Sequence, residues 1–285
     1  MALGIRHPPA QALGPASEGN RSLSVRICVL GSGSRGNSTL IATEKTRLLV
    51  DVGFSKRETF ARLAAVGERA DGFNAIVISH EHSDHIRGLE SLSRDSACRG
   101  APIYINTATR DAISWGRRAK AFELFEPGEK FTVGDIEITP FTIPHDAADP
   151  VAFRFDTQGI GIGVVTDLGY IPALVKRHVT GCHCLIFESN HDLEMLKVGP
   201  YPWVVKQRVM SRHGHLSNLA TAEFLRDDFD GAAQVLVLAH LSENNNHPEI
   251  ARMSAVEALQ GRATCQNGLE LHLASQSAPT PVFRF

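Results

Sequence analysis

The sequence of 285 residues has no apolar stretch near the roughly 18 consecutive residues that a membrane-spanning helix needs. Its first residues are rich in Pro, Gly, Ala and Ser and contain no apolar secretory core. They predict a disordered N-terminal extension, residues 1–22, and not a signal peptide. We therefore expect a cytoplasmic protein that does not act at a membrane.

Cysteines are few, and their odd number argues against a disulfide framework. Two of them flank His183, but no second Cys/His pair follows at the spacing of a zinc finger, so we expect them in a buried strand. This usage indicates a reducing compartment. The cysteines are Cys28, Cys98, Cys182, Cys184 and Cys265.

A strong excess of charge of one sign is also absent, because the net charge is −2. A nucleic-acid ligand therefore needs a local basic face, since phosphate contacts dominate such binding. Residues 117–120 and the set of Lys206, Arg208 and Arg212 are candidates. Solvated surface charge explains them as well.

Short apolar strand patterns alternate with helical patterns, without an internal repeat or a linker. This predicts one α/β domain, residues 23–273, and a C-terminal tail, residues 274–285. In layered α/β folds, sites assemble where strand ends face one edge of a sheet. We expect a shared site from the residues that follow predicted strands, which are Asp51, His80, His145, Asp167, Glu188 and His240.

The strongest local signal is the segment 80–85 (HEHSDH), between a strand pattern and a helical one. At a strand end, residues two apart point the same way, so His80 and His82 can bind one metal ion. Asp84 and His85 suit a second metal ion a few ångströms away. Three imidazoles and a carboxylate make a poor core, so metal binding is favoured over a polar loop with chance histidines.

Two predictions concern the neighbouring helices. Residues 86–92 have the spacing of a single helix, and Thr107 is expected to cap a helix that continues to about residue 120.

The segment 31–37 (GSGSRGN) has the spacing G-x-G-x-x-G, but no helix follows it, so it does not predict dinucleotide binding. We expect a tight turn that directs Ser34 and Asn37 towards the substrate.

The segment 80–85 with His145, Asp167 and His240 resembles the metal-binding motif of the metallo-β-lactamase superfamily. Further segments are similar to the YycJ/WalJ (VicX) branch, whose members are described as 5′ to 3′ DNA exonucleases. These segments are 31–38, 188–192, 201–203, 214–218 and 240–245. The resemblance implies an α/β fold, the αββα sandwich of two mixed β-sheets flanked by helices, and a DNA substrate.

The resemblance also implies two divalent metal ions, with Asp167 bridging them. One ion would be bound by His80, His82 and His145, and the other by Asp84, His85 and His240. Imidazole and carboxylate ligands without thiolate suit Zn²⁺ or Mn²⁺. Two such ions roughly 3.5–4 Å apart can share a hydroxide, the expected nucleophile of a phosphodiesterase.

Similarity to enzymes of the RNase Z type implies that His215 is a general acid or phosphate contact oriented by Glu188, with Asp84 as a catalytic carboxylate. In this chain Leu216 replaces the serine that usually follows the histidine. Capping of the next helix is the alternative role of His215. His191 is a candidate substrate contact, although the start of a surface helix explains it nearly as well.

Two spacings exclude related nucleases. Between Asp167 and His240 there are 72 residues, too few for the inserted domain of RNase J and CPSF-type enzymes. Between His145 and Asp167 there are 21, too few for the tRNA-gripping arm of RNase Z. The alternatives that stay open are a thioester or lactam hydrolase, and a regulatory binding partner with a structural metal site.

Overall fold

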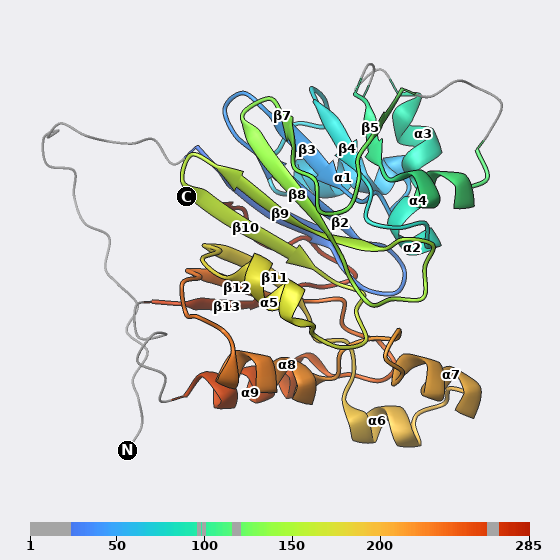
Figure 1. Cartoon of the computed structure of the whole chain (residues 1–285), viewed down its shortest axis with the longest axis vertical. Coiled ribbons are helices and arrows are strands. Elements are labelled where there is room, and N and C mark those ends of the chain that lie inside the picture. The colour runs from blue at the N-terminus through green and yellow to red at the C-terminus, as the bar shows by residue number, and fades with distance from the viewer. Residues whose placement is uncertain (1–23, 96–97, 99–100, 116–120, 261–267) are drawn as a thin grey trace, which may run out of the picture.

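The computed structural model describes residues 24–95, 98, 101–115, 121–260 and 268–285. Two seven-stranded sheets face each other across a core to which both contribute apolar side chains, and helices cover their outer faces (Figure 1). The predicted αββα sandwich is therefore confirmed.

The first sheet has the strand order β14-β1-β2-β3-β4-β5-β6. Pairing is antiparallel from β14 to β3 and parallel from β3 to β6. Its strands are β1 (Arg26–Gly31), β2 (Ser38–Ala42), β3 (Arg47–Val50), β4 (Ala75–Val77), β5 (Ile103–Ile105), β6 (Phe122–Leu124) and β14 (Phe283–Arg284).

The second sheet repeats this plan in the order β13-β12-β11-β10-β9-β8-β7. Pairing is antiparallel from β7 to β10 and parallel from β10 to β13. Its strands are β7 (Phe131–Val133), β8 (Ile136–Thr142), β9 (Val151–Thr157), β10 (Ile160–Val165), β11 (Cys184–Glu188), β12 (Val235–Ala239) and β13 (Glu270–Leu273). The central parallel strands β4, β11 and β12 are buried throughout because both of their faces are covered.

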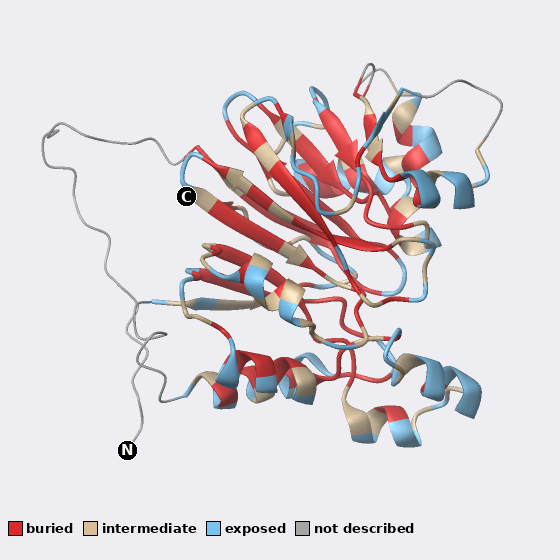
Figure 2. Cartoon of the chain, in the orientation of Figure 1, coloured by how far each residue is buried: buried red, intermediate tan, exposed pale blue. Residues whose placement is uncertain are grey.

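Helices form the outer layers, and their inward faces are buried while their outward faces are exposed (Figure 2). Those near the first sheet are α1 (Lys56–Ala65), α2 (Ser83–Ile86), α3 (Leu89–Ser93) and α4 (Thr107–Ala112). Those packed on the second sheet are α5 (Ala173–Val179), α8 (Asn218–Asp227) and α9 (Pro248–Leu259). The pair α6 (Leu193–Val198) and α7 (Trp203–Val209) extends beyond the strand ends.

The prediction of one helix over residues 86–92 is wrong, because α2 and α3 are separate and meet at Gly88. Gly88 packs tightly there: its backbone N–H donates to the carbonyl oxygen of Val52 (2.7 Å), and a Cβ would lie 2.0 Å from the carbonyl oxygen of Phe54. The chain therefore bends around this contact.

The cap assigned to Thr107 is also wrong. The side chain of Asn106 caps α4, accepting a hydrogen bond from the backbone N–H of Thr109 (2.8 Å), and the helix ends at Ala112. The rest of the predicted helix includes residues 116–120, which lie outside the described part of the chain.

The structure describes the C-terminal end of the chain but not the first residues at the N-terminus. The predicted extension, residues 1–22, lies outside the described residues. The predicted C-terminal tail contains β14, which pairs with β1, so the first sheet reaches beyond the predicted domain boundary at residue 273. Within the described residues, no helix has the length and apolar character needed to span a membrane.

Candidate metal centre

Polar side chains from both sheets meet beyond the carboxyl ends of the strands, as the strand patterns predict. Three of them, Asp51, Asp167 and His240, have left-handed backbones with φ of 56°, 65° and 56°. Asp and His tolerate this conformation better than most residues, but it is still uncommon. At a strand end it turns the chain sharply, and such strain is concentrated at functional sites.

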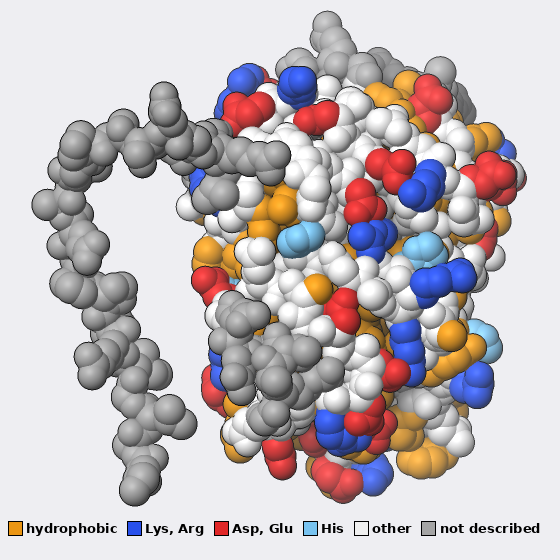
Figure 3. All heavy atoms as spheres, turned by 60° about the vertical axis from the view of Figure 1, so that its left-hand side comes forward, with side chains coloured by type: hydrophobic (Ala, Val, Ile, Leu, Met, Phe, Trp, Pro, Cys, Tyr) orange, Lys and Arg blue, Asp and Glu red, His pale blue; other side chains and the backbone are white. Residues whose placement is uncertain are grey.

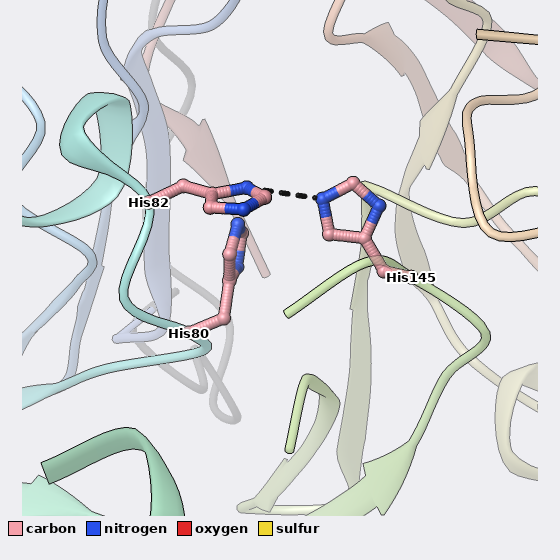
Figure 4. Close-up of side chains that lie close together, drawn as sticks. All are labelled: His80, His82 and His145. Carbon is pink, nitrogen blue, oxygen red and sulfur yellow. Dashed lines mark hydrogen bonds between the residues drawn. The ribbon is translucent and has the colours of Figure 1, made fainter. Parts of the chain in front are cut away.

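The first ligand group consists of His80, His82 and His145 (Figure 4). Nδ1 of His82 and Nε2 of His145 are 3.2 Å apart. Two ligands at about 2.0–2.1 Å from a tetrahedral zinc ion lie about 3.3 Å from each other. The spacing of these imidazoles therefore fits a shared cation.

The second ligand group consists of Asp84, His85 and His240, with Asp167 between the two groups. Asp84 Oδ2 lies 3.5 Å from Nε2 of His240, and Asp167 Oδ2 lies 3.3 Å from Nε2 of His85. The structure thus brings together all seven side chains that the sequence names as ligands, although they come from four separate segments of the chain.

The hydrogen bonding of these atoms also fits a cation. Among the described residues, Nε2 of His80, Oδ2 of Asp167 and Nε2 of His240 are buried without a hydrogen-bond partner. Buried polar atoms without partners are costly, so they point to an ion or a water molecule that satisfies them. Imidazole nitrogens and carboxylate oxygens are typical ligands of Zn²⁺ and Mn²⁺.

Two of the imidazole ligands are oriented by hydrogen bonds to carboxylates that lie behind them. Oδ2 of Asp51 lies 2.8 Å from Nδ1 of His85, and Oε1 of Glu188 lies 2.9 Å from Nδ1 of His240. A carboxylate that accepts from Nδ1 holds the ring so that Nε2 is free to bind a metal. The sequence placed Asp51 at a strand end but assigned it no role; only the fold shows which imidazole it contacts.

The buried carboxylates of the site attract positive charge, either a cation or protons. Burial is outweighed by Asp167 and its neighbours, which raise the pKa of His85 and raise that of His240 to about 10, so metal binding displaces protons at these two imidazoles. Burial opposes ionisation of Glu188, but the nearby imidazoles of His215 and His240 outweigh it and lower the pKa of this carboxyl to about 2. Burial of Asp167 is likewise outweighed by His240 and His85, so its pKa is well below the usual value. Burial lowers the pKa of His80, which keeps this imidazole neutral and able to bind a metal.

The predicted pair of His215 and Glu188 is brought together. Oε1 of the fully buried Glu188 lies 2.8 Å from Nδ1 of His215. His215 lines an open pocket of about 260 Å³ over the ligand groups, and Arg208 of α7 is also part of its wall. Ser217, and not His215, caps α8, since its side chain accepts from the backbone N–H of Ala220.

The three predicted substrate contacts have different positions. Ser34 is exposed and lines the pocket. Asn37 is buried; its Nδ2 donates to Asp84 Oδ2 (3.2 Å) and lies 3.1 Å from Nε2 of His85. His191 is also buried, and it is not among the residues that line the pocket.

Of the three basic residues proposed as a surface for nucleic acid, Lys206, Arg208 and Arg212, not all are exposed. Lys206 is buried and its Nζ donates to the carbonyl oxygen of Lys197 (2.6 Å). Arg208 pairs with Asp146 at the pocket, and Arg212 lies over the ring of Tyr170. Residues 117–120 lie outside the described part of the chain.

Replacing Gly53 with Ala is expected to destabilise the protein by about 3 kcal/mol and to weaken metal binding, because overpacking of a tight contact is costly. A Cβ at Gly53 would lie 1.6 Å from the carbonyl oxygen of Asp84, so the metal-binding loop must move. Urea unfolding and metal titration measure both effects. Gly67→Ala is the control, since a Cβ there meets no atom within 4 Å and only its φ of 73° is unfavourable. Equal stability of the two variants would contradict this account.

The chain is similar in sequence to known proteins. Residues 46–241 match the family described as "Beta-lactamase superfamily domain". The chain is 34% identical to exodeoxyribonuclease YycJ of Bacillus anthracis, over 91% of this chain and 99% of that protein. It is 36% identical to exodeoxyribonuclease WalJ of Streptococcus pneumoniae, over 83% of this chain and 89% of that protein.

A solved structure supports the fold alone. The metallo-β-lactamase fold protein YhfI of Bacillus subtilis matches with a TM-score of 0.67 at 20% identity. The match covers 90% of this chain and 99% of that one.

Proposed function

Because the chain belongs to the metallo-β-lactamase superfamily, in the family of the exodeoxyribonucleases YycJ and WalJ, we propose that it is a metal-dependent 5′ to 3′ DNA exonuclease with two divalent ions, Zn²⁺ or Mn²⁺. The observation that carries this proposal is the convergence of two ligand groups about Asp167 beneath an open pocket. We place the activity in the cytoplasm, where the scattered cysteines stay reduced.

In this proposal each group at the pocket has a defined role. Bound divalent ions supply polarisation of the phosphodiester and activation of water. His215 donates a proton to the leaving oxygen, and Glu188 holds its ring by accepting from Nδ1. Asp84 would help to hold the second ion, and Ser34 would contact the substrate at the pocket. Asn37 acts indirectly, through its contacts with Asp84 and His85, and His191 acts indirectly, because its carbonyl oxygen accepts from the backbone N–H of Asn218 beyond His215.

The charge distribution supports local rather than global attraction of DNA. Acidic and basic side chains are interspersed over the face shown in Figure 3. At the pocket, the basic side chain of Arg208 lines the wall together with the metal-site residues. Arg208 is well suited to bind the phosphate, because guanidinium groups bind phosphate oxygens in a bidentate manner.

The test uses purified protein with Mn²⁺ or Zn²⁺ and DNA labelled at the 5′ or the 3′ end. We expect the 5′ label to be released first as a short product, and chelation of the metal to abolish release. A chromogenic lactam and a thioester are assayed in parallel. Turnover of only these small molecules would support the alternative hydrolase. No turnover by fully metal-loaded protein would support a regulatory role with a structural metal site.

His215→Ala is expected to keep both metal ions and to lower kcat about 100- to 10,000-fold, the usual contribution of a general acid. His215 lies outside the two ligand groups of this proposal, although its ring is also close to Asp167, Glu188 and His240. Metal content measured by mass spectrometry should therefore not change. His213→Ala is the matched control, because His213 is exposed and two residues away. Loss of metal from the His215→Ala protein would assign this residue to the metal site instead.

A further inference from the structure

The segment 198–210, which includes α7, carries a concentration of exposed apolar side chains. Val198, Trp203 and Val204 are 86%, 61% and 75% exposed, and Val205 and Met210 are 37% exposed. These are five of the eleven large exposed apolar residues in the described part of the chain. Exposed apolar side chains that cluster on one surface usually mark a binding surface.

This surface continues into the catalytic pocket through α7. Arg208 lines the pocket, and Val204 lies four residues before it and therefore on the same face of the helix. Trp203 is the first residue of α7. Figures 1 and 2 show α7 beyond the strand ends, with most of its surface exposed.

The position of α7 relative to the catalytic groups is well defined. The backbone N–H of His215 donates to the carbonyl oxygen of Val209, the last residue of α7 (2.9 Å). Nζ of Lys206 donates to the carbonyl oxygen of Lys197, which joins α7 to α6. The helix that carries the exposed apolar side chains is therefore held in place before a ligand arrives, which lowers the entropic cost of binding.

We infer that α7 binds unpaired nucleotides of the DNA strand next to the phosphate that is cleaved, with Arg208 on a phosphate and Trp203 stacked on a base. This inference rests on the proposed function. A guanidinium followed by an aromatic and aliphatic surface matches the phosphate and the flat base that every nucleotide presents. Arg208 lies five positions after Trp203, about 7.5 Å along the helix axis and about 140° around it, so a strand of about two stacked nucleotides that reaches both side chains wraps around α7.

The test measures binding of a fluorescent ten-nucleotide oligodeoxythymidine by anisotropy, with each variant made in the slowly cleaving His215→Ala protein loaded with Mn²⁺. Trp203→Ala is expected to raise Kd about ten-fold, the size of a lost base–aromatic stack. Trp203→Phe should restore most of the affinity, because phenylalanine also stacks. Met253→Ala is the control, since Met253 is 68% exposed on α9 and should not affect Kd.

With active protein, Trp203→Ala should raise KM for the oligonucleotide and leave turnover of bis(p-nitrophenyl) phosphate unchanged, because Trp203 is not part of the pocket wall and this small ester does not reach it. An unchanged Kd for Trp203→Ala overturns the inference while DNA cleavage by the wild-type protein still supports the proposed function. If Kd is unchanged and light scattering shows a dimer that Trp203→Ala dissociates, the surface joins two copies of the chain. A wild-type protein that cleaves no DNA contradicts the proposed function itself.

Discussion

Asp167→Asn is expected to lower kcat/KM for DNA about 1,000-fold, equivalent to about 4 kcal/mol of transition-state stabilisation. Asp167 is buried between the two ligand groups, and its Oδ2 has no hydrogen-bond partner among the described residues. Asn keeps the size of the side chain and tolerates the left-handed φ of 65°, but it loses the negative charge. The variant should fold normally and bind less metal.

The measurements for this variant are exonuclease rate, metal content and thermal unfolding. Asp111→Asn is the matched control, because Asp111 is exposed and pairs with the adjacent Arg110. We expect the control to match the wild-type protein in all three measurements. Two full equivalents of metal in the Asp167→Asn protein would refute a bridging role for Asp167.

Glu188→Gln is expected to lower the free energy of unfolding by about 3–5 kcal/mol, the usual cost of removing one partner from a buried ionic pair. The fully buried carboxylate of Glu188 lies within hydrogen-bond distance of four nitrogens. Oε2 accepts from the backbone N–H groups of Leu168 (3.0 Å) and Leu216 (3.1 Å). Oε1 lies next to Nδ1 of His215 and of His240. The amide of Gln directs N–H groups at donors, so some of these contacts are lost.

Urea unfolding of the metal-free protein tests this prediction without a contribution from bound ions. Glu44→Gln is the control, since Glu44 is a largely exposed residue whose nearest charged partner is 3.9 Å away, and exposed substitutions usually change stability by less than about 0.5 kcal/mol. Activity should fall as well, because both His215 and His240 lose the acceptor that orients them. If Glu188→Gln unfolds at the same urea concentration as the wild type, the four contacts do not stabilise the fold.

Much of the fold follows from local patterns. The strands that end at Asp51, His80 and Asp167 are short, apolar and rich in β-branched residues, so their position is visible in the sequence. The helix after residue 85 was mispredicted because its division depends on a contact between Gly88 and Phe54, and periodicity contains no information about such a contact.

By itself, the sequence determined the type of chemistry: imidazoles and carboxylates at strand ends without thiolates, in the order of a known superfamily. The pairing of Glu188 with His215 is already predicted from the resemblance, but only the tertiary structure decided that Asp51 contacts His85 and that Glu188 also contacts His240. Only the tertiary structure shows that Arg208 lines the pocket, because it belongs to α7, a helix whose position does not follow from the strand patterns. The reason is physical: strand and helix patterns arise from neighbours along the chain, whereas these contacts depend on sheet order and on the path of the loops between distant segments.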